Sequence, residues 1–296
     1  MASDGSLRLY RGAVAIITGG ASGIGRALAT ALAQHGAEII LADIQVEAAE
    51  QTALEIRRLG GNVEVREVDV GDYPAVQNLV HQTLAGHGRI DFLFNNAGIM
   101  VLGHARFYEL ETWRQVLRVN LDGVIHGVQA AYSIMRRQGF GHIVNTASAA
   151  GLVPFSLAAA YTASKHAVVG LSLALRAEAA SWGVRVSALC PGLIRTPMLT
   201  GQQPGNRLHP FPPNPRLKNR VSRRAMDPDR FAAKVLAGLR KNRPLIVTPW
   251  RVNLLRWVNC GWLPLLLRRQ AAVAARIDAY LTAQGIEPDQ QVPAKE

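Results

Sequence analysis

The sequence predicts an α/β fold: one doubly wound parallel sheet of about seven strands, with helices on both faces. The main observation is a regular alternation of short apolar runs with helix-periodic segments from residue 13 to about 248, unbroken by a linker. A glycine-rich turn follows the first apolar run and opens the first helical segment. In addition, 49% of the 296 residues are hydrophobic, which is enough for one large core. We therefore expect a single domain over residues 1–296, with its core at about 10–248.

The individual elements follow from local patterns. Uninterrupted apolar runs are expected as buried strands, whereas apolar residues that recur every three or four positions indicate helices. Glycines end the first two helices, at Gly36 and at Gly60-Gly61. The expected strands are 13–18, 38–43, 63–68, 91–95, 142–146, 184–189 and 245–248. The expected helices are 24–35, 46–59, 72–85, about 109–137 and 158–181.

The glycine-rich turn, Thr18–Gly25, has the composition of a phosphate cradle. Its glycines permit a tight turn and close approach of a pyrophosphate, which the N–H groups and the dipole of the following helix attract. Further on, Asp43 ends the second strand, where a carboxylate accepts hydrogen bonds from ribose hydroxyls and repels a 2′-phosphate. The next residue is Ile44 rather than an arginine. This pattern favours NAD(H) over NADP(H), although Arg26 is near enough in sequence to weaken the preference.

Tyr161 and Lys165 are four residues apart in an alanine-rich helical segment, so both side chains lie on one helix face, one turn apart. A free tyrosine has a pKa near ~10 and is a poor base at neutral pH. A neighbouring ammonium group favours the phenolate and is expected to lower the pKa of Tyr161. The pair therefore predicts a proton donor and acceptor.

With its neighbours in the same order, this pair resembles the classical short-chain dehydrogenase/reductase family, whose fold is of the Rossmann type. The glycine turn, the Asn95-Asn96-Ala97-Gly98 turn after the fourth strand and the Tyr161/Lys165 pair match motifs of that family. The resemblance covers residues 10 to about 248, and no catalytic position departs from it. The other matching positions are Asp69, Val70, Asn120, Ser148, Pro191, Gly192, Ile194, Thr196 and Met198.

The resemblance implies hydride transfer between nicotinamide C4 and a carbinol or carbonyl carbon. It implies Tyr161 as the general acid/base, Lys165 as the group that lowers its pKa and holds the nicotinamide ribose, and Ser148 as the residue that positions the substrate oxygen. Asn120 is expected to hold a water that links Lys165 to solvent. The implied contacts to NAD(H), or to NADP(H) as the second choice, are Gly19, Ser22, Gly23, Ile24, Gly25, Asp43, Asp69, Val70, Asn96, Ala97, Gly98, Tyr161, Lys165, Pro191, Ile194 and Thr196.

This sequence pattern is compatible with three functions. The first is an NAD(H)-dependent oxidoreductase that interconverts a secondary alcohol and a ketone. The second is an NADP(H)-dependent carbonyl reductase with the same catalytic residues. The third is a non-catalytic dinucleotide-binding regulator, because a fold alone does not fix a function. The intact set of Ser148, Tyr161 and Lys165 favours an enzyme, since a pure sensor needs no proton donor beside the nicotinamide.

The expected substrate side of the site is apolar. Residues 199–224 contain five prolines and six Lys or Arg, so they cannot be regular helix or strand throughout, and the resemblance implies a mobile substrate lid there. Apolar residues also follow the fourth and fifth strands, where they either line the substrate pocket or pack in the core. If they line the pocket, they favour a bulky, hydrophobic alcohol or ketone over a sugar. These residues are Met100, Val101, Leu102, Val153, Pro154, Phe155 and Leu157.

The net charge of +12 is concentrated late in the chain. Residues 195–276 carry 17 Lys or Arg and 2 Asp or Glu, whereas residues 1–194 are balanced. This excess is either a solvated surface or a contact for an anionic surface or substrate, and no nucleic-acid-reading motif accompanies it. The C-terminal extension, 249–296, begins with three tryptophans among leucines and arginines over 249–270. That segment either lies at a membrane interface or covers the substrate pocket or a partner subunit.

Further features bear on location and assembly. The two cysteines, Cys190 and Cys260, make no disulfide framework, and the eight histidines lack ligand spacing, so no metal site is expected. Residues 1–12 lack an apolar signal region and no apolar run is long and uncharged enough to span a bilayer. We therefore expect a cytoplasmic enzyme, with or without peripheral membrane contact. The helices over 109–137 and 158–182 are apolar on several faces, which together with the resemblance implies a homodimer or homotetramer.

Overall fold

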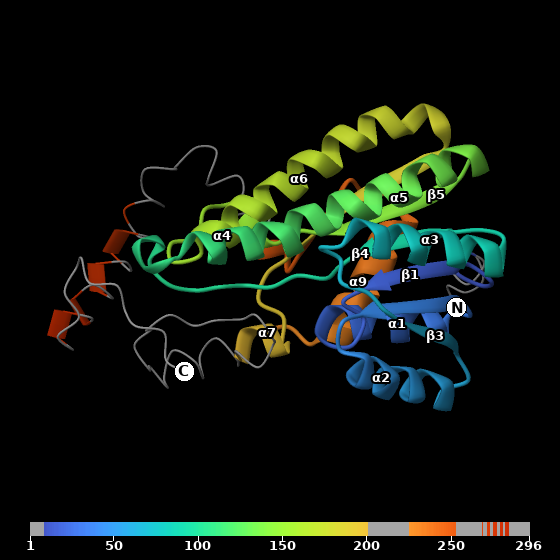
Figure 1. Cartoon of the computed structure of the whole chain (residues 1–296), viewed down its shortest axis with the longest axis horizontal. Helices are drawn as coiled ribbons and strands as arrows, with labels where there is room; N and C mark the ends of the chain where they lie inside the picture. Colours follow the sequence, from blue (N-terminus) through green and yellow to red (C-terminus); the bar gives the residue numbers. More distant parts are fainter. Residues whose placement is uncertain are drawn as a thin grey trace.

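A computed structural model of the chain describes residues 9–200 and 225–252, together with isolated helical positions between 268 and 283. The strands are β1 Val14–Thr18, β2 Glu38–Asp43, β3 Asn62–Glu67, β4 Phe92–Asn95, β5 Gly141–Thr146, β6 Val184–Pro191 and β7 Leu245–Thr248. They form one sheet in the order β3-β2-β1-β4-β5-β6-β7, and every neighbouring pair is parallel (Figure 1). The winding reverses between β1 and β4, so the predicted doubly wound α/β sheet is confirmed.

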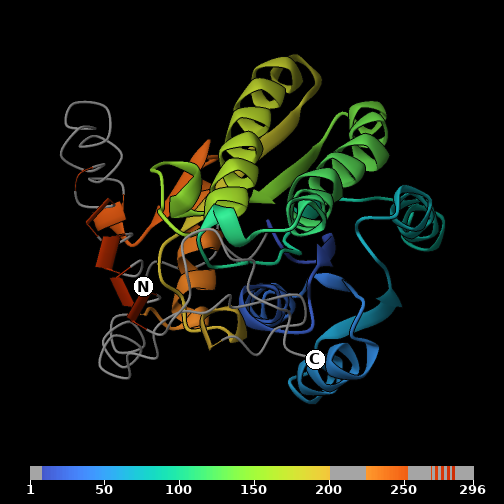
Figure 2. The same ribbon diagram turned by 60° about the vertical axis from the view of Figure 1, so that its left-hand side comes forward.

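Helices cover both faces of the sheet. They are α1 Gly23–Gln34, α2 Val46–Arg58, α3 Tyr73–His87, α4 Leu110–Leu117, α5 Gly123–Gln138, α6 Ala159–Ala179, α7 Pro197–Thr200 and α9 Pro228–Arg240. Successive side chains of a strand point to opposite faces. Accordingly, Ala15 and Ile17 of β1 join a core with α1, α2 and α9, whereas Val14 and Ile16 join a second core with α3, α5 and α6. Figures 1 and 2 show these two helical layers on either side of the sheet.

One long helix, α9, was not predicted from the sequence pattern. It occupies the connection between β6 and β7. The Asp227 carboxylate caps it by accepting hydrogen bonds from the N–H groups of Asp229 (3.0 Å) and Arg230 (3.4 Å). Its apolar face, which includes Phe231 and Val235, is fully buried in the same core as α1. Its buried residues recur every three or four positions, and Asp227 and Pro228 form a helix-start pattern, so local signals for this helix were present in the sequence.

The helical region expected over 109–137 is not one regular helix. A π-helical turn, Arg118–Asp122, joins α4 to α5. Such a turn inserts an extra residue into the helix and changes the direction of the side chains around it. Asn120 lies in this turn and is fully buried. The irregularity therefore determines where the Asn120 side chain points.

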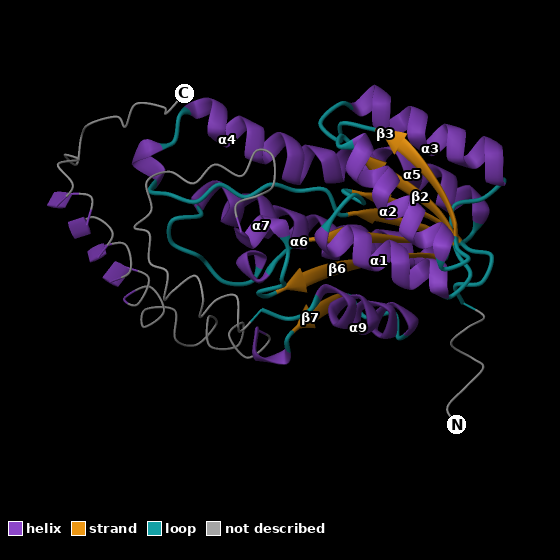
Figure 3. Cartoon of the chain, turned by 90° about the horizontal axis from the view of Figure 1, so that it is seen from below, coloured by secondary structure: helices purple, strands orange, loops and turns teal. Residues whose placement is uncertain are grey.

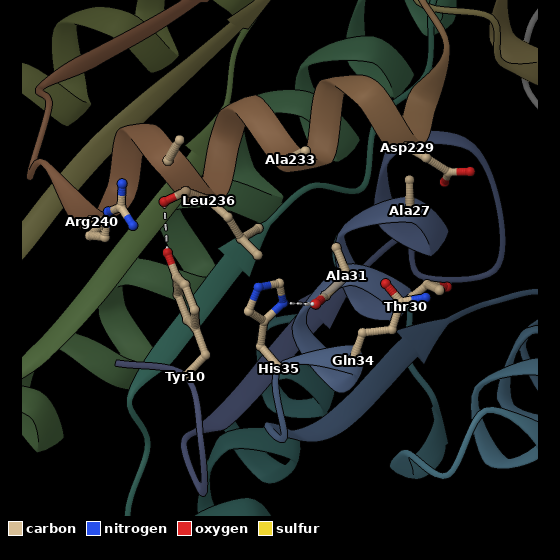
Figure 4. A pocket seen from close by; sticks show the side chains of 11 residues that line it. Tyr10, Ala27, Thr30, Ala31, Gln34, His35, Asp229, Ala233, Leu236 and Arg240 are labelled. Atoms are coloured by element: carbon tan, nitrogen blue, oxygen red, sulfur yellow. Dashed lines mark hydrogen bonds between the residues drawn. The ribbon is translucent and has the colours of Figure 1, made fainter. Parts of the chain in front are cut away.

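The segment before β1 is fastened to α9. The Tyr10 hydroxyl donates a hydrogen bond to the carbonyl of Leu236 at 2.7 Å, and burial raises the pKa of Tyr10 to about 12. Beside it, a hollow of about 390 Å³ lies between α1 and α9, and His35 Nδ1 approaches the Ala31 carbonyl oxygen at 2.7 Å (Figure 4). None of the residues predicted for the catalytic or cofactor site lines this hollow, so we assign it to imperfect packing between the two helices.

The strand β7 forms one edge of the sheet, with α9 beside it (Figure 3). The N–H of Gly192 donates to the Thr248 carbonyl at 2.8 Å, which ties the ends of β6 and β7 together. A short turn follows, in which the N–H of Val252 donates to the Pro249 carbonyl at 2.9 Å. Within the described parts of the chain, no helix is both long enough and apolar enough to cross a membrane.

Candidate active site

The carboxyl ends of the central strands open into a cavity of about 810 Å³. Ligands of doubly wound sheets bind at this edge, near the reversal of strand order. The cavity is lined by the glycine turn after β1 and by the segments that follow β4, β5 and β6. The predicted site residues that line it are Gly19, Ser22, Gly23, Ile24, Asn96, Ala97, Gly98, Ser148, Tyr161, Lys165, Pro191, Ile194 and Thr196.

The glycine turn requires glycine at the positions that the sequence singled out. Gly19 and Gly23 have positive φ values of 65° and 54°, which L-residues with a side chain rarely adopt. A Cβ on Gly19 would lie 2.8 Å from the Ala97 Cα, and a Cβ on Gly25 would overlap the Gly19 carbonyl oxygen. The turn therefore presents bare backbone at the start of α1, where N–H groups attract an anion, so it fits the pyrophosphate of a dinucleotide.

Asn96 braces this turn from the neighbouring strand. Its side-chain Nδ2 donates to the carbonyl oxygens of Thr18 (3.0 Å) and Gly19 (3.2 Å). Its Oδ1 accepts a hydrogen bond from the Thr146 hydroxyl at 3.2 Å. One amide thus links the ends of β1, β4 and β5, which explains why this residue type follows the fourth strand.

Asp43 holds the other side of the turn. Its two carboxylate oxygens accept hydrogen bonds from the N–H groups of Ala21 (2.9 Å) and Gln45 (3.0 Å), and the residue is buried. A carboxylate has about four acceptor positions, so both oxygens can accept further hydrogen bonds. Arg26, which the sequence placed near this site, forms an ion pair with Glu55 on α2 at 2.6 Å. That pairing directs the guanidinium toward α2.

The five predicted residues outside the cavity lining are Gly25, Asp43, Asp69, Val70 and Asn120. Asp69 Oδ1 accepts from the N–H of Gly71 at 2.8 Å, and its Oδ2 pairs with Arg118 at 2.9 Å. Val70 is buried, and its carbonyl oxygen lies 2.8 Å from His126 Nδ1. These contacts attach the segment after β3 to the π-helical turn and to α5. Asp69 and Val70 therefore lie after β3, against the turn that holds Asn120, and do not line the cavity.

Tyr161 and Lys165 lie on the buried side of α6, and Lys165 Nζ is 5.7 Å from the centre of the Tyr161 ring. The ammonium donates to the Thr146 carbonyl at 2.8 Å. Burial lowers the pKa of Lys165 to about 8. Burial also raises the pKa of Tyr161, against a smaller lowering by its hydrogen bond with Ser148.

The expected lowering of the Tyr161 pKa by Lys165 is therefore wrong for the chain by itself. Desolvation disfavours the phenolate, and Lys165 is directed to Thr146 rather than to the Tyr161 oxygen. The sequence shows that the two residues share a helix face. It does not show how deeply that face is buried or which carbonyl the ammonium group contacts.

Ser148 stands at the end of β5 in extended conformation. Its Oγ accepts a hydrogen bond from the N–H of Ala150 at 3.1 Å, which caps the short 3₁₀ turn Ala149–Gly151. The same side chain hydrogen-bonds the Tyr161 hydroxyl across the cavity. Ser148 is thus held by backbone on one side and directed at the predicted acid/base on the other.

Asn120 reaches the site from behind the cavity wall. Its Oδ1 accepts from the Ile99 N–H at 2.8 Å, and its Nδ2 donates to the Ile99 carbonyl at 2.9 Å and to Ser164 Oγ at 3.2 Å. A Cβ on Gly98 would lie 3.1 Å from Asn120 Oδ1 and 3.4 Å from Lys165 Nζ. Asn120 and Lys165 therefore flank the same glycine, where only a residue without a side chain fits easily.

The apolar residues proposed for the substrate side divide into two groups. Met100, Leu102 and Phe155 line the cavity. Val101 and Val153 are buried in the core, and the cavity lining also excludes Pro154 and Leu157. Alternation of side chains along an extended segment explains why Val101 points away from its two neighbours.

Other residues complete the lining. Met198, Leu199 and the residues after 248 belong to stretches that the sequence already associated with the site, whereas Thr146, Ser156 and Leu193 were not singled out. Thr146 and Leu193 lie at or just beyond the ends of β5 and β6, and that position was the available signal. The remaining lining residues are Ala147, Ala149, Ala150, Ala158, Gly192, Pro197, Pro249, Arg251 and Val252. The predicted lid, 199–224, lies outside the described residues beyond position 200, as does the extension after 252 apart from isolated positions between 268 and 283.

Comparison with known proteins identifies the family of the chain. The family model of the short chain dehydrogenases matches residues 13–207. A cyclohexanol dehydrogenase of Acinetobacter sp. (strain SE19) is 36% identical over 207 residues, which are 68% of this chain and 82% of that relative. A short chain dehydrogenase/reductase structure from Burkholderia phymatum in complex with NAD has a TM-score of 0.78 and 31% identity, covering 87% of this chain and 96% of that one. A structure from Beutenbergia cavernae with bound NADP at low occupancy has a TM-score of 0.70 and 31% identity, covering 80% and 95%.

These matches span the glycine turn, the Asn96 brace and the Ser148–Tyr161–Lys165 group. The sequence similarity extends over most of this chain. The similarity in fold extends over nearly all of each solved structure. The chain therefore belongs to the short-chain dehydrogenase family of NAD(P)-dependent oxidoreductases, which act on CH–OH groups.

Proposed function

We propose that this enzyme is an NAD(H)-dependent oxidoreductase that interconverts a secondary alcohol and a ketone on a bulky, hydrophobic substrate. The observation that carries the proposal is the meeting of Ser148, Tyr161 and Lys165 in one cavity with the glycine turn. The non-catalytic alternative is set aside, because the relatives named above are dehydrogenases and this catalytic group is complete.

The proposed roles follow from the contacts. When bound, the nicotinamide ring supplies or accepts the hydride. Tyr161 takes the hydroxyl proton during oxidation and returns it during reduction, and Ser148 holds the substrate oxygen beside it. The Lys165 ammonium, with its pKa lowered to about 8, is poised to exchange a proton near neutral pH. Gly19, Gly23 and Ile24 would hold the pyrophosphate at the start of α1.

Proton exchange with solvent is assigned to Lys165 and Asn120. Asn120 uses its amide to bind Ile99 and Ser164, yet Oδ1 keeps a second acceptor position beside Gly98. The proposed role is to hold a water next to the buried ammonium.

The preference for NAD(H) is supported by charge. The Asp43 carboxylate repels a 2′-phosphate, Ile44 is exposed and uncharged, and Arg26 is paired with Glu55. Because Asp43 also holds the turn through the N–H of Ala21, the test variant is Asp43→Asn with Ile44→Arg, which keeps an oxygen acceptor. We expect the ratio of NADPH to NADH affinity to rise. The proposal fails if the unmodified enzyme already binds NADPH more tightly than NADH.

The substrate class is supported by the cavity wall and by one relative. Met100, Leu102, Phe155 and Val252 give the substrate side an apolar lining. A related protein is named for cyclohexanol, a ring alcohol. We therefore propose alicyclic alcohols and ketones as the first substrates to examine.

Assembly into a homodimer or homotetramer is part of the proposal. Large apolar side chains are exposed on the layer formed by α4, α5 and α6: Leu110 at 64%, Ile125 at 41% and Leu173 at 39%. Covering them with a second copy removes this apolar area from water.

The catalytic assignment is tested with Tyr161→Phe. The variant retains the ring and the packing of α6 and loses the hydroxyl. We expect NADH binding to be unchanged and kcat to fall by about 10²–10⁴-fold on any accepted alcohol. Tyr108→Phe serves as the matched control, because that hydroxyl donates to the Val101 carbonyl (2.7 Å) outside the cavity lining. Near-normal kcat in Tyr161→Phe would end the assignment.

A further inference from the structure

A second large groove lies at the β7 edge of the sheet, against α9 and the turn after β7. Its volume is about 810 Å³. Among the described residues, its only carboxylate is Asp227, which lies 4.0 Å from Arg195. Six exposed cationic side chains line it: Arg195, Arg230, Lys234, Lys241, Arg243 and Arg251.

These charges converge from separate segments. Arg230 and Lys234 are four residues apart and share the exposed face of α9. The buried face of the same helix carries Phe231 and Val235. Lys241 follows the helix, and Arg195 and Arg251 follow β6 and β7. Like charges at this spacing destabilise a helix slightly, so folding alone gives no reason for the arrangement.

An exposed tryptophan stands among these cations. Trp250 lines the groove, and 70% of its surface is exposed. An indole beside Lys and Arg is typical of protein surfaces at a membrane interface, where the ring enters the headgroup region and the cations meet anionic lipids. The sequence that follows, 253–267, adds two tryptophans and six leucines.

This composition favours lipid over the other anionic partners. A two-fold contact between copies would set six cations against the same six cations. A nucleic acid or an acidic protein would be attracted by the charges, but neither requires the tryptophan and leucine content of the sequence over 250–267.

The groove also adjoins the active-site cavity. Pro249 and Arg251 line both. A membrane surface in contact with the residues that line the groove would therefore lie beside the apolar wall of the substrate cavity. A hydrophobic substrate could then move from the lipid to the cavity without crossing water.

We propose that the groove between α9 and β7 is a docking surface for membranes rich in anionic phospholipids. The charges draw the protein to the membrane, and Trp250 enters the headgroup layer. This contact is reversible. It depends on the groove and not on the proposed chemistry, so the test uses binding rather than turnover.

The experiment is flotation of the full-length protein with vesicles of phosphatidylcholine alone or with about one third phosphatidylglycerol. We expect binding to the anionic vesicles only, and release at high salt, because exposed charges are screened there. Each cation near an anionic surface strengthens binding by roughly fivefold. Lys234→Glu with Lys241→Glu should therefore weaken binding by at least about 25-fold.

Two controls separate the groove from net charge. Arg58→Glu with Arg137→Glu makes the same change of charge at exposed positions of α2 and α5 and should bind vesicles like the unmodified protein. Trp250→Ala should weaken binding even at low salt, whereas Trp182→Ala, at an indole that is 45% exposed on the α6 side, should not. NADH binding confirms that each variant is folded.

Three results would overturn the proposal. One is flotation that stays unchanged both in the variant Lys234→Glu with Lys241→Glu and in the milder variant Lys234→Gln with Lys241→Gln. Another is an equal loss in both charge-reversal pairs. The third is absence of flotation by the unmodified protein, including the case in which it binds duplex DNA or polyglutamate instead.

Discussion

Replacement of Ser148 by alanine tests the origin of the Tyr161 pKa. Burial raises that pKa and the hydrogen bond with Ser148 lowers it, so removal of the hydroxyl leaves the raising effect unopposed. A hydrogen bond to a charged group contributes about 1.5–3 kcal/mol, so its loss is large enough to measure. The pKa of Tyr161 should therefore rise in Ser148→Ala.

The assay is the pH dependence of kcat/KM for alcohol oxidation. Tyr161 acts as a base in that direction, so the rate rises with pH as the hydroxyl loses its proton. In Ser148→Ala this rising limb should move to higher pH, in addition to a lower plateau from lost substrate positioning. Ser156→Ala removes a hydroxyl from the same cavity and should leave the limb in place.

A limb that does not move in Ser148→Ala, with only the plateau reduced, would refute this reasoning. It would mean that Ser148 orients the substrate but does not stabilise the ionised tyrosine. Equal shifts in Ser148→Ala and Ser156→Ala would also refute it, because they would point to a general change in the polarity of the cavity.

Two further predictions concern the glycine turn and a buried histidine. Gly25→Ala should abolish NADH binding, measured by fluorescence titration, because the added Cβ would overlap the Gly19 carbonyl oxygen. Gly86→Ala is the control, since Gly86 of α3 faces open space, and this variant should bind NADH normally. Tight NADH binding by Gly25→Ala would contradict the described geometry of the turn. His142 is buried against Ser187 Oγ at 2.9 Å, and burial lowers its pKa from 6.5 to about 3, so the unfolded chain takes up the proton first as the pH falls. The unfolding free energy should fall by about 2 kcal/mol between about pH 6.5 and 4.5 for this reason, and urea unfolding of His142→Gln should show a correspondingly smaller loss. Identical losses in both proteins would exclude His142 as the source.

Much of the fold was accessible from the sequence because its signals are local. Each strand that the sequence predicted lies within two residues of its observed ends, since an apolar run between turns, or the alternating polarity of 63–68, allows few other structures. The glycine turn was equally clear, because Gly19 and Gly23 adopt backbone angles that few other residues tolerate. The helix α9 was missed although its signals are also local: an N-cap at Asp227, a proline at Pro228 in the first turn, and buried residues every three or four positions.

Thirteen of the predicted site residues line one cavity, whereas the electrostatics of the site could not be predicted. The spacing of Tyr161 and Lys165 places them on one helix face, and the tertiary structure gathers Ser148 beside them from another segment. Whether the tyrosine pKa rises or falls depends on desolvation, which is a sum over every group that surrounds it. The direction of Asn120 depends likewise on a π-helical turn that no periodicity marks.

The sequence by itself determined the doubly wound sheet, the dinucleotide turn and the order of the site residues, because periodicity, glycine and short-range spacing act over a few neighbouring positions. Only the tertiary structure decided that Met100 lines the cavity while Val101 fills the core, and that Arg195, Arg230 and Arg251 meet in one groove. The burial of a side chain and the summed field of several charges depend on segments that are far apart in the chain. These effects are therefore defined only after those segments have packed together.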